Sequence, residues 1–206
     1  MAKILLGKEA EKMLRLPAAK SEYVKNSAHM VKIAKRFHFP LVLKIISNKA
    51  IHKTEIKGVR IVDDESELRK NYIEIAKTAR RLKGKIMAQE FVSGRELIIG
   101  IKKDPVFGHA IMFGIGGTLV EALRDVTFRI CPISASDAES MIDELKYKQI
   151  IYGFRGEKPA NVNQIKSILV KVSKLPVRNK KITELDINPL IANDKAAKIV
   201  DVRIRI

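Results

Sequence analysis

The spacing of apolar and polar residues predicts a mixed chain of short helices and strands. Helical periodicity marks residues 8–16, 27–37, 66–82 and 161–175, and a further helix opens at Ser136. Strand-like runs cover residues 41–46, 59–62, 86–92, 96–102, 109–113, 125–132, 184–190 and 199–203. Ser27 and Ser66 stand where N-caps are expected. The connections are short, and Ser93-Gly94-Arg95 interrupts two strands, so we expect a hinge near Val92 and Ser93 between two α+β lobes.

Polar residues break the apolar pattern in the last two strands. Asp186 and Asn188 are two positions apart, so in an extended strand they point to the same face. If the run around Asp201 lies antiparallel beside them, three oxygen ligands meet on one sheet. Such hard ligands suit Mg2+ carrying substrate phosphates. The alternative is an exposed sheet face with ordinary polar residues.

Two features of the first half carry candidate chemistry. Lys44 interrupts an apolar strand, where a buried ammonium group requires an anion such as a nucleotide phosphate. The alternative is an edge-strand lysine that reaches solvent. His52 and Lys53 precede Thr54 in a loop that ends at Gly58, and they offer a nucleophile and a cation to a phosphoryl group. A surface histidine without a role is the alternative for His52.

Two further segments surround the expected hinge. In Gln89-Glu90-Phe91-Val92-Ser93-Gly94-Arg95-Glu96, backbone groups could meet an adenine edge and a carboxylate could meet ribose hydroxyls. The glycine-rich segment 114–118 could hold an anion through its backbone amides. A tight turn between two elements explains this second segment almost as well.

Composition narrows the class of protein. The 206 residues are 46% hydrophobic, which is enough for one large domain or two lobes. We find no apolar run of about 18 residues and no signal-peptide pattern, so we expect an intracellular protein with no membrane partner. The single cysteine, Cys131, excludes an internal disulfide and a multi-cysteine zinc site, and we expect it to pack as a small hydrophobic residue.

The charge balance favours anionic partners. With 40 Lys and Arg against 23 Asp and Glu, the net charge of +17 attracts nucleic acid, nucleotides, coenzyme A phosphates or an acidic subunit. The basic residues are scattered, aromatic residues make up only 5%, and Trp is absent. This distribution argues against a dedicated nucleic-acid reader.

Taken in order, these segments resemble the ATP-grasp beta subunit of archaeal ADP-forming acetate–CoA (acyl-CoA) ligases. The resemblance runs from about residue 5 to residue 203. It rests on LVLKIIS (41–47), IHKTEIKGV (51–59), QEFVSGRELIIGIKKDPVFG (89–108), MFGIGGTLVEALRDVTFRICPIS (112–134), YGFRGEKPA (152–160) and ELDINPLI (184–191). It implies an α/β chain with the ATP-grasp fold, in which two α+β lobes hold the nucleotide between them. Residues 1–206 would form one such domain, with a small lobe at 17–92 and a large lobe at 93–206 together with 1–16.

The resemblance also assigns roles to single residues. Nucleotide binding falls on Lys44, Gly58, Glu90, Phe91, Val92 and Glu96, and Mg2+ binding falls on Asn188, Asp201 and Asp186. His52 matches the family histidine that relays phosphate, with Lys53 beside it. Gly116, Gly117, Glu121 and Arg129 would receive the phosphohistidine loop of the partner. Lys57 and Glu55 replace the usual Gly and Asp of the histidine segment, which affects the geometry of that loop.

The implied reaction is acyl-CoA + ADP + phosphate ⇌ acid + ATP + CoA, with the phosphoryl group passing through histidine. ATP or ADP and Mg2+ would be the cofactors of this chain. CoA and the phosphohistidine would belong to a separate alpha subunit, in a cytoplasmic α2β2 assembly. Two alternatives remain open. One is the ATP-grasp subunit of another acid–CoA ligase, like succinyl-CoA synthetase, or of an acyltransferase. The other is a non-catalytic, basic nucleic-acid-binding or scaffold module.

Overall fold

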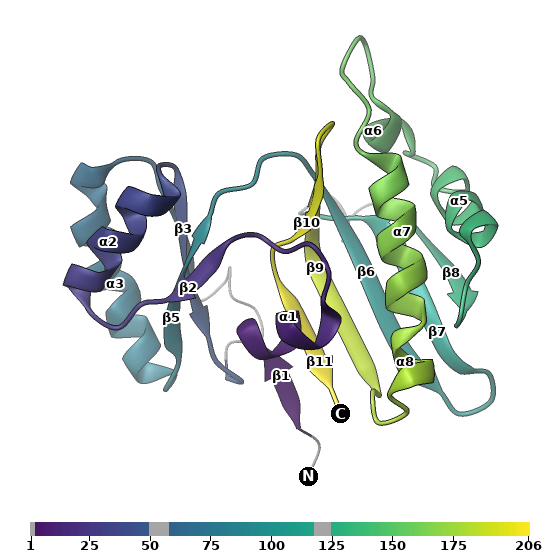
Figure 1. The fold of residues 1–206 in the computed structure, drawn as a ribbon, viewed down its shortest axis with the longest axis horizontal. Helices are drawn as coiled ribbons and strands as arrows, with labels where there is room; N and C mark the ends of the chain where they lie inside the picture. Colours follow the sequence, from purple (N-terminus) through teal and green to yellow (C-terminus); the bar gives the residue numbers. More distant parts are fainter. Residues whose placement is uncertain (1–2, 50–57, 118–124) are drawn as a thin grey trace. The chain divides into compact units, whose positions relative to one another are not determined.

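The chain forms two compact units of mixed α and β structure (Figure 1). The computed structural model describes residues 3–49, 58–117 and 125–206. Residues 19–92 make up the small unit, and residues 1–18 and 93–206 make up the large unit. Among the described residues, no helix combines the length and the apolar character that a membrane crossing requires.

The small unit packs two helices against a four-stranded antiparallel sheet. Its elements are β2 (Ser21–Tyr23), α2 (Ser27–Phe37), β3 (Leu41–Ile46), β4 (Val59–Val62), α3 (Glu65–Arg81) and β5 (Lys85–Glu90). The strand order is β2-β5-β3-β4, so β3 is an inner strand. Leu43 and Ile45 of β3 pack with Ile33 of α2 and Ile75 of α3, and this alternation buries every second residue of β3 on the helix side.

Both helices of the small unit begin at caps other than the predicted ones. The side chain of Asn26 accepts a hydrogen bond from the His29 N–H at 2.8 Å. The side chain of Asp64 accepts one from the Ser66 N–H, also at 2.8 Å. The prediction of Ser27 and Ser66 as caps was wrong, because an Asn or Asp just upstream already satisfies the free amides of each first turn.

The large unit is built on a seven-stranded antiparallel sheet. Its elements are β1 (Ile4–Leu6), α1 (Lys8–Leu14), β6 (Arg95–Asp104), β7 (Gly108–Ile115), β8 (Val126–Ile130), α5 (Ala135–Asp143), α6 (Gln149–Tyr152), α7 (Val162–Ser173), α8 (Leu175–Arg178), β9 (Glu184–Ala192), β10 (Ala197–Ile199) and β11 (Val202–Arg205). The strand order is β1-β11-β9-β6-β7-β8, and β10 pairs with β9. The predicted helix over 161–175 is α7, which ends two residues earlier at Ser173, and the short helix α8 follows it.

Helices cover one face of this sheet (Figure 1). Leu185 and Ile187 of β9 and Val202 of β11 are buried in one core with Ile165 and Leu169 of α7. Residues between them in each strand point the other way. We call this opposite side of the large sheet the polar face, since it carries Glu96, Asp186, Asn188, Asp201 and Arg203.

A β-bulge interrupts β9 on the polar face. Ile99 of β6 pairs with Ile187, whereas Leu97 pairs with Leu190, so Asn188 and Pro189 together oppose one residue of β6. A bulge leaves one residue outside the regular ladder and re-aims the side chains beside it. Proline fits this position because it has no N–H to donate to the ladder. The bulge therefore sets Asn188 apart from the regular strand.

Candidate functional site

The predicted metal ligands come together on adjacent strands of the large unit. β9 and β11 are antiparallel, with Ile187 opposite Val202 and Asp186 opposite Arg203. The next pair is Asn188 and Asp201, whose backbone N and O atoms are 3.2 Å apart in a hydrogen bond. Since Ile187 and Val202 both face the helices, their neighbours in each strand face away from them. The antiparallel arrangement that the sequence predicted is confirmed.

Further backbone bonds fix this part of the polar face. The Val200 N–H donates to the Pro189 carbonyl oxygen at 3.0 Å, and the Asp201 N–H donates to the same oxygen at 3.4 Å. Asn188 is exposed, whereas Asp186 and Asp201 are half-buried. These positions are therefore held by the main chain and leave side-chain oxygens at the surface of the large unit.

The donor set fits Mg2+ better than a softer metal. It consists of two carboxylates and one amide oxygen, and Mg2+ is usually held by one or two carboxylates while water and phosphates fill the remaining positions. Within the described ranges, no group of three or more His, Cys, Asp and Glu side chains could hold a metal by itself. A site here thus depends on Asn188 and on ligands that the substrate supplies.

Glu96 and the glycine-rich turn are direct neighbours in the large unit. The Gly116 N–H donates to the Glu96 carbonyl oxygen at 2.6 Å. Gly117 has φ +83°, and a Cβ atom there would lie 2.7 Å from Oε2 of Glu96. Glycine is favoured at this position by the positive φ, and a side chain there would require the Glu96 carboxylate to move. The turn and Glu96, one of the predicted nucleotide-binding residues, thus form one cluster.

Lys44 lies within the small unit rather than at its edge. It is 3% exposed, and it pairs with Met87 of β5 on one side and Val59 of β4 on the other. Its place between Leu43 and Ile45 in the alternation puts it on the sheet face away from α2 and α3. The alternative of an edge-strand lysine reaching solvent was therefore wrong. Gly58 is close by, because its carbonyl oxygen accepts a hydrogen bond from the Ile45 N–H at 2.8 Å.

The segment after β5 offers backbone groups. The Glu90 side chain accepts a hydrogen bond from the Lys20 N–H at 3.0 Å, and the Glu90 N–H donates to the Lys20 carbonyl oxygen at 2.9 Å. Phe91 is 41% exposed and Val92 is half-buried. In the part of the chain that the structure describes, the backbone of Phe91 and Val92 makes no hydrogen bond. These N–H and C=O groups are available to a planar, hydrogen-bonding ligand.

Comparison with known proteins decides the family. A family model described as an ATP-grasp domain matches residues 2–206. The chain belongs to the ATP-grasp family. The fold that the sequence predicted is thereby confirmed, and a solved structure of a relative matches the chain with a TM-score of 0.90.

That structure is a dinucleotide forming acetyl-coenzyme A synthetase 1 of Ca. Korarchaeum cryptofilum, in complex with coenzyme A, Ca-AMPCP and HgCl+. It is 41% identical, over 98% of this ATP-grasp chain and 93% of that chain. The beta subunits of the ADP-forming acetate–CoA ligases I and II of Pyrococcus furiosus are 39% and 41% identical, over 95% of this chain and over 88% and 89% of their own lengths. The 4-hydroxybutyrate–CoA ligase of Nitrosopumilus maritimus is 38% identical over 96% of this chain, and the match spans 30% of the ligase's own length.

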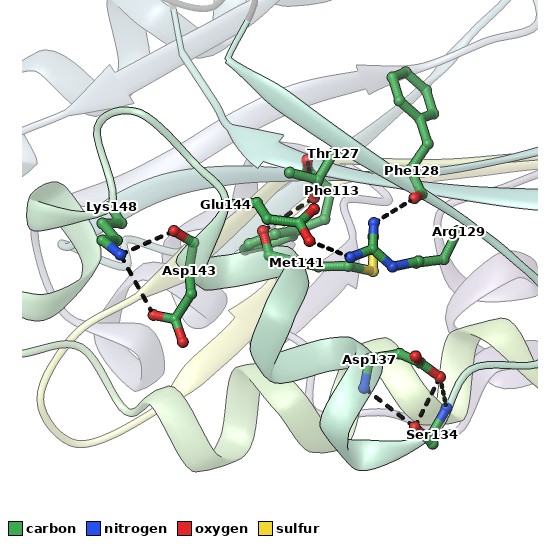
Figure 2. A network of polar contacts seen from close by, with 10 residues as sticks. All are labelled: Phe113, Thr127, Phe128, Arg129, Ser134, Asp137, Met141, Asp143, Glu144 and Lys148. Carbon is green, nitrogen blue, oxygen red and sulfur yellow. Dashed lines mark hydrogen bonds and ion pairs between the residues drawn. The ribbon is translucent and has the colours of Figure 1, made fainter.

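Arg129 lies away from the glycine-rich turn of this ATP-grasp chain. It pairs with Ile111 of β7, five residues before Gly116, which is roughly 16 Å along a strand. Its guanidinium forms an ion pair with Glu144 and donates to the Phe128 carbonyl oxygen at 2.8 Å, as Figure 2 shows. The hydrogen bond with Glu144 raises the pKa of Arg129. The arginine thus joins β8 to the end of α5.

Three of the predicted residues, His52, Lys53 and Glu121, lie outside the described residues. Arg203, by contrast, was missed by the sequence reasoning. It is directly opposite Asp186 and two residues after Asp201, so it adds a cation to the polar face of the ATP-grasp chain. The spacing Asp201-Val202-Arg203 was visible in the sequence, and the same period of two that linked Asp186 to Asn188 could have identified it.

Proposed function

We propose that this chain is the nucleotide-binding beta subunit of an ADP-forming acyl-CoA ligase, with a carboxylic acid such as acetate as product. The reaction is acyl-CoA + ADP + phosphate ⇌ acid + CoA + ATP. The observation that carries the proposal is the pairing of Asn188 with Asp201 on the polar face, in a chain 39% and 41% identical to two beta subunits of acetate–CoA ligases.

Within this function, Asn188, Asp201 and Asp186 would hold Mg2+. The metal would supply positive charge to the phosphate oxygens during transfer. Support comes from a second Korarchaeum structure, 40% identical with a TM-score of 0.83 over 98% of this chain and 92% of that chain, which is in complex with coenzyme A and Mg-AMPPCP. Arg203 lies beside these ligands and would add a second cation for the same oxygens.

Further residues are proposed to contact the nucleotide. The backbone of Phe91 and Val92, following Glu90, would meet the edge of the adenine, and Glu96 would accept hydrogen bonds from the ribose hydroxyls. Lys44, with Gly58 nearby, would hold a phosphate. The dielectric constant around a buried group is lower than in water, so a phosphate beside this ammonium group would be attracted more strongly than at an exposed lysine.

Phosphoryl transfer would run through histidine. Gly116 and Gly117 have the backbone freedom to receive a phosphohistidine loop, and Glu121 follows them in the chain. In the second Korarchaeum structure the phosphohistidine segment points towards the nucleotide binding site. His52 would relay the phosphate, with Lys53 offsetting its charge. We propose that CoA and the partner histidine belong to a separate alpha subunit, and that two copies of each subunit assemble in the cytoplasm.

The proposal is tested by reconstitution with a purified alpha subunit. ATP formation from acetyl-CoA, ADP and phosphate should be at least 100-fold slower with Asp201→Asn than with the wild-type chain, on the order of the loss from removing one transition-state contact. Asp194→Asn is the matched control, because Asp194 is a surface carboxylate 3.7 Å from Lys158, and it should retain full activity. Equal rates for Asp201→Asn and wild type would contradict the proposal.

The relay through His52 has a separate test. The alpha subunit is phosphorylated, mixed with this chain and quenched, and peptide mapping then locates acid-labile phosphate. We expect the label on His52 and a loss of turnover in His52→Ala. Unchanged turnover in that variant would rule out the relay while leaving the nucleotide site intact.

A further inference from the structure

Two hollows flank the short helix α8 at one end of the large unit. The first encloses about 680 Å³ between the end of α1 and the α7–α8 segment. The second encloses about 380 Å³ between α8 and the turn that joins β6 to β7. Figure 1 shows α1, α8 and this turn at the same end of the unit. His109, which lines the second hollow, contacts the carbonyl oxygen of Ile182, which lines the first, at 2.7 Å, so the two hollows are neighbours.

The first hollow is strongly basic. Its lining contains five cations and no carboxylate, namely Lys12, Arg15, Lys171, Lys174 and Arg178. All five are exposed, and within the described residues none of their side chains has an ion pair or a hydrogen bond. On the same helix as Lys171, Lys166 pairs with Glu139 at 3.1 Å. Five unpaired cations therefore surround this one hollow, whereas the cation on the outer part of the same helix is neutralised by a carboxylate.

Helix dipoles account for only part of this charge. α1 and α7 both end here, and a cation in the last turn of a helix stabilises its free carbonyl groups. Lys12 and Lys171 occupy those last turns. Arg15 and Lys174 are the C-cap residues of α1 and α7, and Arg178 ends α8, which has only four residues and therefore a small dipole. Five like charges around one hollow repel one another, so an anion bound there would offset this repulsion.

Exposed apolar side chains stand at the second hollow, which Phe107 and Val177 line, and at Val106 beside it. Val106, Phe107 and Val177 are 79%, 68% and 57% exposed. The turn that carries the first two is fixed, because Asp104 Oδ1 accepts hydrogen bonds from the Val106 N–H and the Phe107 N–H, each at 2.8 Å. A side chain held on a fixed turn loses little entropy when it becomes buried in a complex.

We propose that this surface, which we call the basic–apolar face, docks an acidic polypeptide segment with apolar side chains, contributed by the partner subunit. The inference rests on the proposed function insofar as that function requires a partner. Charge complementarity selects an acidic segment, and the lining of the first hollow by Met13, Leu16 and Leu175 selects one with apolar side chains. Nucleic acid fits less well, because bases stack on aromatic rings and two of the three exposed apolar residues are valines.

The test is the affinity of the purified partner subunit for charge-reversed variants, measured by sedimentation at low and moderate salt. The face variant carries Lys171→Glu and Arg178→Glu, which reverse two charges of the basic–apolar face. Lys146→Glu/Lys195→Glu is the matched control, because both lysines are exposed, belong to the large unit, line neither hollow and give the same change in charge. We expect at least a tenfold weaker association for the face variant at low salt, and less than a threefold change for the control. Phe107→Ser should weaken association at both salt concentrations.

The binding of MgADP to the same proteins separates this proposal from the proposed function. We expect MgADP affinity to be equal in the face variant, the control and the wild type. If the wild-type chain does not bind MgADP, that result would contradict the proposed nucleotide site but not the docking proposal. Equal association of the face and control variants would overturn the docking proposal. A face variant that keeps its partner but no longer binds an unrelated RNA oligonucleotide would overturn it as well, in favour of a polyanion site.

Discussion

The Asn188 backbone N–H donates to the Asp201 carbonyl oxygen, with the two atoms 3.2 Å apart. This bond joins the two proposed magnesium ligands through the main chain, and the bond from Val200 to Pro189 supports it at 3.0 Å. Neither bond uses a side-chain atom. Substitution of either side chain should therefore remove a metal ligand without disturbing the pairing of β9 with β11.

Gly117→Ala should destabilise the chain and weaken nucleotide binding. At φ +83° an alanine costs about 1–2 kcal/mol, and its Cβ atom would meet the Glu96 carboxylate. Gly108→Ala is the matched control, because Gly108 has φ +84° and nothing within 4 Å of the added atom. Urea unfolding should show a similar decrease in the free energy of unfolding for both variants. Calorimetry should show weaker MgADP binding only for Gly117→Ala. Equal MgADP affinities of the two variants would contradict a contact between Glu96 and the nucleotide.

Lys44→Met should weaken MgADP binding by about 10- to 100-fold, which is the effect of losing one hydrogen bond from a charged group. The circular dichroism spectrum should be unchanged, since methionine fills a similar volume in the buried strand. Lys70→Met, at an exposed position of α3, should change neither the affinity nor the spectrum. Full affinity in Lys44→Met would exclude a phosphate contact.

Cys131 should react slowly with thiol reagents. Burial raises the pKa of the Cys131 thiol to about 11. The reactive thiolate is therefore a minor species at pH 8, and alkylation should be on the order of 100-fold slower than for a thiol with the usual pKa near 8.5. The rate should rise as the pH approaches 11, and denaturing urea should restore fast labelling. Fast labelling of the folded chain at pH 8 would show that the thiol is not buried.

Thr127→Val should cost about 1–3 kcal/mol. The Thr127 hydroxyl is buried and donates to the Met141 carbonyl oxygen of α5 at 3.0 Å, a bond drawn in Figure 2. Valine keeps the shape but leaves that buried oxygen without this donor. Thr183→Val is the control, because the exposed Thr183 hydroxyl bonds the Arg205 carbonyl oxygen at 3.3 Å where water can replace it. Equal costs in urea unfolding would refute the explanation.

The sequence predicted the longer helices and strands, because their apolar pattern repeats over enough neighbouring residues to be recognised. The alternation was sufficient to place Asp186 and Asn188 on one face, because a strand has a fixed period of two, and Asp201 joined them only on the condition that the two runs lie antiparallel. The short strands β1 and β2 were missed, since three residues carry little periodicity and form strands only through pairing. The start of α5 was also displaced, because Ser134 rather than Ser136 forms the capping box with Asp137.

Side-chain partners were harder to predict than strand faces. The sequence assigned Arg129 to loop docking, which stays a prediction, but it did not predict the ion pair of Arg129 with Glu144, fifteen residues further along the chain. That contact depends on how α5 lies against β8, which no local pattern specifies. The burial of Lys44 likewise follows from the inner position of β3, and this position is a property of the strand order rather than of the strand itself.

The most direct test of the nucleotide site is calorimetric titration of MgADP into the isolated chain and its Asp201→Ala variant, at moderate salt so that nonspecific attraction to the basic surface is screened. We predict saturable binding by the wild type that requires Mg2+ and is lost in the variant, with circular dichroism unchanged. Binding of equal strength in both proteins, or binding that ignores Mg2+, would contradict the assignment of Asp201 and Asn188 as metal ligands.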